Sequence, residues 1–318
     1  MYRPLFYYKF QEEYLNMSKK GSILTALLGA GVAAGASVWY FGRKRNMEKQ
    51  EEVQPEEPAM TPEEELVAQM PNLIKEDRFQ LWVQPVVDLK TGDIVGGEVL
   101  SRLDHPERGL VFPNNFLPAI EKAGLTDKFD HYVFGKTCIL INKLTKQGIH
   151  VQYLSCNFCR MTLSEQGVVE RLVRIADEYG VNHEKLALEI TEQELETDAE
   201  QFNQNLRQLK EEGFRIFVDD LGAGVTSVRD LWSHPVDVAK NDRSLLLDAE
   251  TERGRIAYRG LRNLAADLGC KVLCEGVETE EQRQFVQDVG CDYCQGFLFY
   301  RPMEQSKFMD LMDGISKE

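Results

Sequence analysis

Acidic side chains follow several short apolar runs of the sequence, and their repetition suggests chemistry. Glu98 lies in GGEVLSR, Glu189 in LALEIT and Glu275 in KVLCEGVE, and Asp219 and Asp220 end FRIFVDD. Carboxylates at strand ends are how a fold collects hard oxygen ligands for divalent cations. Each residue taken alone is better explained as a turn or helix-cap residue. Their recurrence favours one shared site.

Strand-like runs alternate with helix-like segments after the first quarter of the chain. The runs are 79–89, 94–103, 151–158, 185–191, 214–220, 235–240, 271–276 and 292–299. Amphipathic helix patterns lie between most of them, which is typical of a mostly parallel sheet. Eight such strands predict an α/β fold, the (β/α)8 TIM-like barrel, in which the carboxyl ends of the strands converge on one active-site face.

The polar residues at the predicted strand ends would then meet. They are Glu98, Asn157, Glu189, Asp219, Asp220, Lys240, Glu275 and Gln295. Carboxylates, an amide oxygen and a lysine, without histidine, suit Mg²⁺ or Mn²⁺ rather than zinc. The adjacent Asp219 and Asp220 could serve two ions about 3.5–4 Å apart, as in two-metal phosphoester hydrolysis. An Asx turn is the alternative for one of them, but burying both without cations would be costly.

Composition limits the function classes. A chain of 318 residues with 43% hydrophobic content can bury the core of a single barrel. Its formal charge of −15 argues against a surface built for nucleic acid polymers. Seven scattered cysteines indicate reduced thiols in a cytosolic compartment. The CxxC pairs at 156–159 and 291–294 lie in strand-like segments, where positions i and i+3 face opposite ways, so a zinc site is disfavoured.

The N-terminal part has a different character. No charged residue occurs in 21–42, and this length meets the roughly 20 residues that a bilayer-spanning helix needs. We therefore predict an N-terminal tail at 1–20 and a transmembrane helix at 21–42. The basic residues at 43–45 place the remainder in the bacterial cytoplasm, at the inner membrane, although the lysines at 19–20 oppose this orientation.

Two alternatives concern this N-terminal part. A cleaved signal peptide would also be rich in Ala and Gly, but the cysteine usage and the basic stop-transfer residues favour an anchor. Met17 is an alternative start to Met1.

Gly31 and Gly35 form a GxxxG face that could pair two helices, and we expect a homodimer through this face or through the barrel.

A charged, Pro- and Glu-rich linker is predicted at 43–65, with the catalytic domain at 66–318. Order should resume where Thr61 can cap a helix, Pro62 suits its first position and Glu64 completes a capping box.

The C-terminal part resembles the EAL domain, a bacterial phosphodiesterase module that opens cyclic di-GMP to linear pGpG. The family signature Glu-Ala-Leu-x-Arg is similar to EVLSR at 98–102, which HPERG follows at 105–109. Further similar segments are SCN at 155–157, LEITE at 188–192, DDLG at 219–222, KND at 240–242, EGVET at 275–279 and QGF at 295–297.

The resemblance implies roles for individual residues. One Mg²⁺ or Mn²⁺ ion would be held by Glu98, Asn157, Glu189 and Asp219. Asp219 would bridge to a second ion, held by Asp220 and, through a water, by Glu275. Lys240 and Glu275 would be catalytic, Lys240 by orienting or helping to deprotonate the attacking water. The substrate, cyclic di-GMP, would contact Gln84, Arg102, Asp242, Glu278 and Gln295. Arg102 would take a phosphate oxygen, and Glu278 would brace the loop after Asp220.

That loop departs from the family pattern. The usual DDFGTGYSS reads DDLGAGVTS at 219–227, so Ala223 replaces a Thr hydroxyl and Val225 an aromatic ring. The first hypothesis is therefore an active, membrane-anchored cyclic di-GMP phosphodiesterase. The alternative is a non-hydrolytic EAL module that acts as a nucleotide receptor or a protein-interaction platform.

Overall fold

The computed structural model describes residues 60–195, 199–222 and 228–317. The chain divides into two compact units, Met1–Glu65 and Leu66–Glu318. The predicted tail, membrane helix and most of the linker lie outside the described residues, and so does the altered loop at 223–227. In the part that is described, no helix combines the length and the apolarity that a bilayer crossing requires. The membrane helix stays a prediction.

The first described helix, α2 (Pro62–Lys75), begins with the predicted capping box. The Thr61 backbone N–H donates to Glu64 Oε2 at 2.8 Å, and the Glu64 N–H donates to Thr61 Oγ1 at 3.3 Å. These bonds satisfy backbone donors that a helix start otherwise leaves unpaired. The helix then buries Leu66, Met70 and Leu73.

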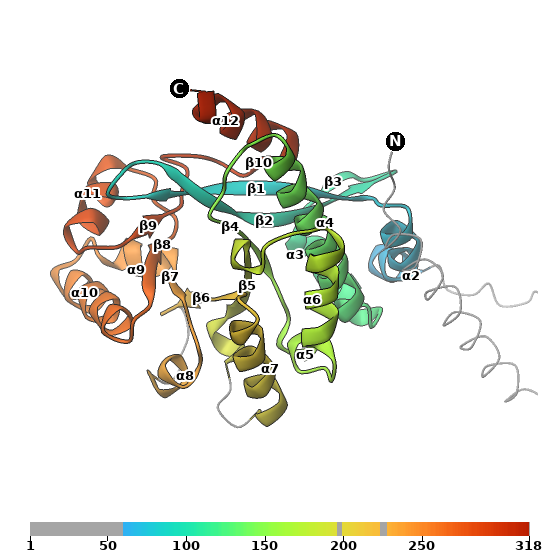
Figure 1. Cartoon of the computed structure of the whole chain (residues 1–318), viewed down its shortest axis with the longest axis horizontal. Helices are drawn as coiled ribbons and strands as arrows, with labels where there is room; N and C mark the ends of the chain where they lie inside the picture. Colours follow the sequence, from blue (N-terminus) through green and yellow to red (C-terminus); the bar gives the residue numbers. More distant parts are fainter. Residues whose placement is uncertain (1–59, 196–198, 223–227, 318) are drawn as a thin grey trace, which may run out of the picture. The chain divides into compact units, whose positions relative to one another are not determined.

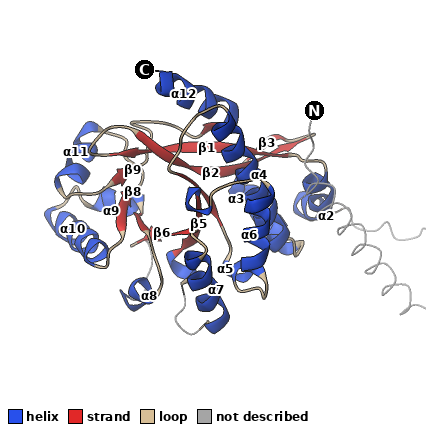
Figure 2. Ribbon diagram, in the orientation of Figure 1, coloured by secondary structure: helices blue, strands red, loops and turns tan. Residues whose placement is uncertain are grey.

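One sheet contains all the strands of the described residues, and eight of them close into a barrel (Figures 1 and 2). The strands are β1 (Phe79–Asp88), β2 (Ile94–His105), β3 (Gly109–Val111), β4 (Tyr153–Asn157), β5 (Leu186–Thr191), β6 (Arg215–Leu221), β7 (Val238–Asn241), β8 (Lys271–Cys274), β9 (Tyr293–Cys294) and β10 (Met303–Glu304). Because β1 pairs with both β2 and β9, the ring closes. The predicted eight-stranded barrel is confirmed, with β3 and β10 as additions at its edges.

The first barrel strand differs from a regular βα repeat. β1 is antiparallel to β2, whereas the neighbours from β2 through β4 to β9 are parallel. A tight turn connects β1 to β2, with Gly92 at φ 81° and the Lys90 N–H donating to Asp88 Oδ1 at 2.8 Å. So short a connection cannot return the chain in parallel. The N-terminal half of β1 therefore lies beside the C-terminal half of β2.

Helices surround the barrel. They are α3 (Pro113–Lys122), α4 (Thr126–Lys146), α5 (Arg160–Leu163), α6 (Val168–Glu178), α7 (Glu200–Glu211), α8 (Val228–Ser233), α9 (Arg243–Asp248), α10 (Glu252–Asp267), α11 (Glu280–Asp288) and α12 (Gln305–Lys317), with single 3-10 turns η1 (His183–Lys185) and η2 (Glu192–Glu194). Their apolar faces cover the outward-facing strand residues. All seven cysteines are unpaired thiols, and most are buried.

An apolar plug fills the barrel interior. It takes one residue from each barrel strand: Val86, Val95, Tyr153, Ala187, Phe217, Val238, Leu273 and Tyr293. The Tyr153 and Phe217 rings meet edge to face, with centroids 4.9 Å apart. This tightly packed layer supports the polar residues that lie further along the strands.

Candidate metal centre and active site

Polar side chains form the next layer of the barrel interior, toward the carboxyl ends of the strands. For each of β5 to β9, one polar residue in or directly after the strand lies two positions after a plug residue, because alternate residues of a strand share one face. The pairs are Ala187/Glu189, Phe217/Asp219, Val238/Lys240, Leu273/Glu275 and Tyr293/Gln295. The period-two pattern thus positions the acids.

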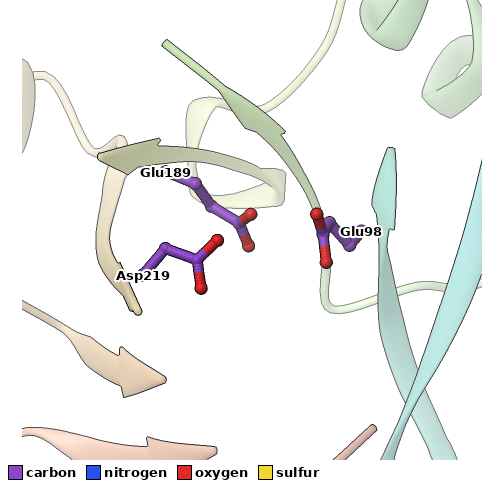
Figure 3. Close-up of side chains that lie close together, drawn as sticks. All are labelled: Glu98, Glu189 and Asp219. Atoms are coloured by element: carbon purple, nitrogen blue, oxygen red, sulfur yellow. The ribbon is translucent and has the colours of Figure 1, made fainter. Parts of the chain in front are cut away.

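Two groups of carboxylates converge closely enough to hold metal ions. Oxygens of Glu98, Glu189 and Asp219 lie within 4.8 Å of one another, and so do oxygens of Asp219, Asp220 and Glu275. Figure 3 shows the first group, with three carboxylates pointing toward a common centre from separate strands. Asp219 belongs to both groups. Five of the predicted carboxylates therefore form one continuous shell.

The stagger of the strands brings residues of different strands to the same height. Asn157 on β4 is opposite Glu189 on β5, but Asp219 on β6 is opposite Thr191, two residues beyond Glu189. Strands tilt in a closed barrel, so points at equal height shift in register from strand to strand. A shift of two residues keeps the side chains on the inner face.

A bulge explains how two adjacent aspartates serve one site. In a regular strand Asp219 and Asp220 would face opposite sides. The β6–β7 register runs from Val218 opposite Ala239 to Leu221 opposite Asn241, so β6 carries one extra residue there. Asp220 takes a left-handed backbone with φ 58°, and its N–H donates to Asp219 Oδ1 at 2.9 Å. Bulges of this kind redirect side chains beside active sites.

The Lys240 ammonium lies among the carboxylates. Its Nζ is 3.3 Å from Glu98 Oε2, 3.2 Å from Glu189 Oε2, 3.0 Å from Asp219 Oδ1 and 2.9 Å from Glu275 Oε1. The Lys240 side chain is fully buried. One fixed positive charge therefore faces four carboxylates, which leaves the centre short of cations.

The pKa values reflect this shortage. Burial opposes the charge on Lys240, yet the surrounding carboxylates hold its pKa well above the ordinary value. Burial raises the pKa of Glu189 well above its usual range, with Glu98 and Asp219 adding to the rise and Lys240 opposing it. Burial likewise raises the pKa of Glu275 to about 8, against the effect of Lys240. Such a set of buried acids favours the binding of further cations.

Comparison with known proteins places this barrel in a family, because the EAL domain model matches residues 67–302. The chain belongs to the EAL family. The cyclic di-GMP phosphodiesterase RocR of Pseudomonas aeruginosa is 31% identical over 255 residues, covering 78% of this chain and 65% of RocR. The cyclic di-GMP phosphodiesterase NbdA of the same organism is 30% identical over 244 residues, covering 76% and 31%. An uncharacterized protein of Mycobacterium bovis is 34% identical over 232 residues, covering 72% and 37%.

Solved structures agree with this membership. A cyclic di-GMP complex of the phosphodiesterase MucR of Pseudomonas aeruginosa has a TM-score of 0.72 and 29% identity, covering 77% of this chain and 99% of that one. An EAL domain protein of Listeria monocytogenes has a TM-score of 0.68 and 29% identity, covering 77% and 96%. The chain spans only 31% of NbdA and 37% of the mycobacterial protein. The likeness therefore concerns one EAL domain, not those whole proteins.

Two amides of the EAL domain flank Glu98. Asn157 Nδ2 donates to Glu98 Oε1 at 3.3 Å, and Gln295 Nε2 donates to Glu98 Oε2 at 3.0 Å. Gln295 is buried, and its Oε1 has no hydrogen-bond partner among the residues that the structure describes. Gln295, predicted to contact the substrate, thus holds a carboxylate of the metal centre in this structure.

The other residues that were predicted to contact the substrate lie in different surroundings. Gln84 is opposite Glu98 in the β1–β2 ladder and donates to the Tyr300 carbonyl at 3.2 Å. Arg102 is buried on β2, beyond Glu98 toward the carboxyl end of the strand. Asp242 caps α9, where its Oδ1 accepts the Ser244 N–H at 2.9 Å. This capping hydrogen bond is enough to explain an aspartate at position 242, without any contact to a substrate.

Sequence reasoning missed the residue that supports the start of the loop after Asp220. Glu192, buried at the end of LEITE, accepts the Gly222 N–H on its Oε2 at 2.7 Å. The predicted brace, Glu278, instead pairs with Arg243 at 2.9 Å. Glu192 lies three positions after Glu189 in the family motif LEITE, and that position is the available signal. Contacts of Glu278 with 223–227 lie outside the described residues, so that part of its role stays a prediction.

Proposed function

We propose that this chain hydrolyses cyclic di-GMP to linear pGpG with two Mg²⁺ or Mn²⁺ ions. The observation that carries the proposal is the pair of carboxylate groups that share Asp219. Shared carboxylates are how two-metal phosphoesterases hold their ions. Relatives named as cyclic di-GMP phosphodiesterases, and a related domain solved with cyclic di-GMP, support this substrate.

The donor set fits hard divalent cations, since it consists of oxygen atoms and includes no sulfur or imidazole. Glu98, Asn157, Glu189 and Asp219 would hold one ion; Asp219, Asp220 and Glu275 would hold the second. When bound, the ions would supply a water of lowered pKa and neutralise charge on the phosphate.

The protein's own groups perform the remaining tasks. In the metal-free centre the neighbouring carboxylates hold the pKa of Lys240 well above its ordinary value, although burial opposes the charge. With the ions bound, Lys240 would orient the attacking water or help to deprotonate it. Arg102 offers its guanidinium to a phosphate oxygen. Gln295 and Asn157 fix the orientation of Glu98 through their bonds to its two oxygens.

Turnover of the full chain with cyclic di-GMP and Mg²⁺ or Mn²⁺, read as pGpG formed, tests this proposal. Glu98→Gln should lower kcat by at least about 100-fold, since it removes a ligand charge from the centre. The exposed Glu280→Gln is the matched control, because its carboxylate contacts only the surface residue Arg283 in the described structure. Binding of the nucleotide by wild type without turnover would instead establish the receptor alternative.

We also propose that residues 21–42 anchor the EAL domain at the cytoplasmic face of the bacterial inner membrane, with homodimerisation there. The uncharged run and the basic residues at 43–45 support this arrangement. Reporter fusions after residue 60 test it: a cytoplasmic reporter should be active and a periplasmic one silent. The reverse result would overturn the topology. Crosslinking of the full chain in membranes should trap a dimer, and recovery of monomer alone would contradict dimerisation.

A further inference from the structure

Arg102 is a buried cation with no salt-bridge partner among the described residues, and the charge of Glu98 acts on it only from a longer distance. Its residue exposure is 7%, its Nη1 donates to the Ser101 carbonyl at 2.8 Å, and its Nε has no hydrogen-bond partner. Among the described residues no carboxylate forms a salt bridge with it; Asp104, two residues later, pairs with Arg78 at 3.6 Å instead. Buried charges are normally paired. The missing anion therefore points to a ligand.

Two aromatic side chains contact this guanidinium. Its Cζ is 5.6 Å from the centroid of the Trp82 ring and 5.0 Å from that of Phe112. Both distances lie within the roughly 6 Å range of cation–π attraction. The Trp82 indole N–H is itself buried and has no hydrogen-bond partner in the described part of the chain, while Phe112 is 51% exposed. A half-exposed ring over a buried arginine marks the edge of an accessible surface.

The fold explains why these rings meet Arg102. β1 runs antiparallel to β2 with Gln80 opposite Arg102, so Trp82 lies one diagonal step away on the same face. The β2–β3 ladder places Val111 opposite Leu103, and Phe112 follows directly. Arg102 comes four residues after Glu98 on β2, which corresponds to about 13 Å along the strand on the same face.

We propose that Trp82 and Phe112, the aromatic clamp, are positioning residues that fix the plane of the Arg102 guanidinium for a phosphate oxygen of the cyclic dinucleotide. Contact with ring faces leaves the N–H edge of an arginine free for an oxyanion. The clamp thus orients substrate at a distance from the carboxylates. This inference rests on the proposed function and extends it to two residues outside the EAL signature.

The test compares clamp variants of the full chain. Trp82→Leu and Phe112→Leu should each raise KM for cyclic di-GMP by about 3- to 30-fold, the range expected for losing a partly buried cation–π contact, with a smaller effect on kcat. Trp82→Phe and Phe112→Tyr, which keep a ring, should recover most of the loss. Leu117→Ala, an exposed apolar residue of α3, is the matched control for surface truncation. Dissociation constants measured with Ca²⁺ in place of Mg²⁺ should follow KM.

A double variant separates positioning from general packing. Trp82→Leu in an Arg102→Ala background should add no further loss, because the clamp acts through Arg102. An unchanged KM in both leucine variants, or a full additional loss in the double variant, would overturn the clamp. Absence of turnover by wild type would instead refute the phosphodiesterase proposal, and the dissociation constants would then decide the clamp alone; absence of nucleotide binding by wild type overturns both.

Discussion

Asn241 is a polar residue in an apolar setting. Its side chain is fully buried, and in the described structure neither the amide oxygen nor the amide nitrogen has a hydrogen-bond partner. It stands between Leu221 and Cys274 in the ladder, both of which belong to the outer apolar core. Leu has the same branching at Cγ and no polar atoms. Asn241→Leu should therefore raise the free energy of unfolding by about 1–3 kcal/mol.

Urea denaturation of the two proteins measures this difference. Asn241→Ser, which keeps a polar group and removes volume, serves as the matched comparison and should destabilise. A leucine variant less stable than wild type would mean that the amide is satisfied after all.

The types of residue at the site are predictable from the sequence, but the residues that each of them contacts in the folded protein are not. Asp219 and Asp220 stood out as a pair, yet the sequence alone does not reveal the bulge that lets both face one centre. The sequence predicts a substrate contact for Gln295, and the structure adds a contact that the sequence does not predict, because the Gln295 nitrogen donates to Glu98, 197 positions away. A side chain's partner depends on which residues the fold brings near it, and that information is non-local.

Among the elements, the barrel strands were predictable because period-two and buried apolar runs mark them. The direction of β1 was not foreseen. The segment at 89–93 was visible as a break between two runs, but only a count of its length shows that it is too short for a crossover helix. The direction of β1 matters for the site, since it brings Gln84 and Trp82 beside β2.

Helix α4 carries two adjacent buried side chains, Asp130 and His131, whose ionisation changes the stability of the protein in opposite directions as the pH rises. Burial raises the pKa of Asp130 to about 7, although its Oδ2 accepts the Thr162 hydroxyl at 2.6 Å and the Cys159 N–H at 3.0 Å. Burial lowers the pKa of His131 to about 4. Unfolded, the two groups titrate near pH 3.9 and 6.5. As pH rises from about 4 to 7, the folded state retains a proton on Asp130 that the unfolded chain releases, so stability is lost.

His131 acts in the other direction. Its contribution is complete above about pH 6.5 and is lost as pH falls toward 4, because the unfolded chain takes up a proton that the folded state refuses. Asp130→Asn should leave only the second effect, so its stability should rise with pH from 4 to 6.5. Relative to wild type, it should gain about 2–4 kcal/mol between pH 4 and pH 8. Thermal unfolding at several pH values checks this, and parallel curves for both proteins would refute it.

For the whole molecule, the formal charge of −15 and the acid-rich centre have a common consequence. Carboxylates gathered in a protein core lower its stability unless cations or bound protons compensate their charge. In the absence of metal, Lys240 is the cation that contacts four of these carboxylates, and they come from several strands of the barrel. Stability and metal binding should therefore be coupled.

Lys240→Met tests the coupling. The Met side chain preserves much of the volume but leaves four carboxylates without their cation, so metal-free protein should lose about 3–5 kcal/mol of unfolding free energy. Divalent ions bind only the folded state, and saturating Mg²⁺ should raise the melting temperature of the variant more than that of wild type. The matched control is Lys210→Met, which breaks a surface pair with Asp237 and should cost no more than about 1 kcal/mol. If Lys240→Met melts with wild type in metal-free buffer, the carboxylates are already neutralised by protons, and Lys240 serves the reaction rather than the fold.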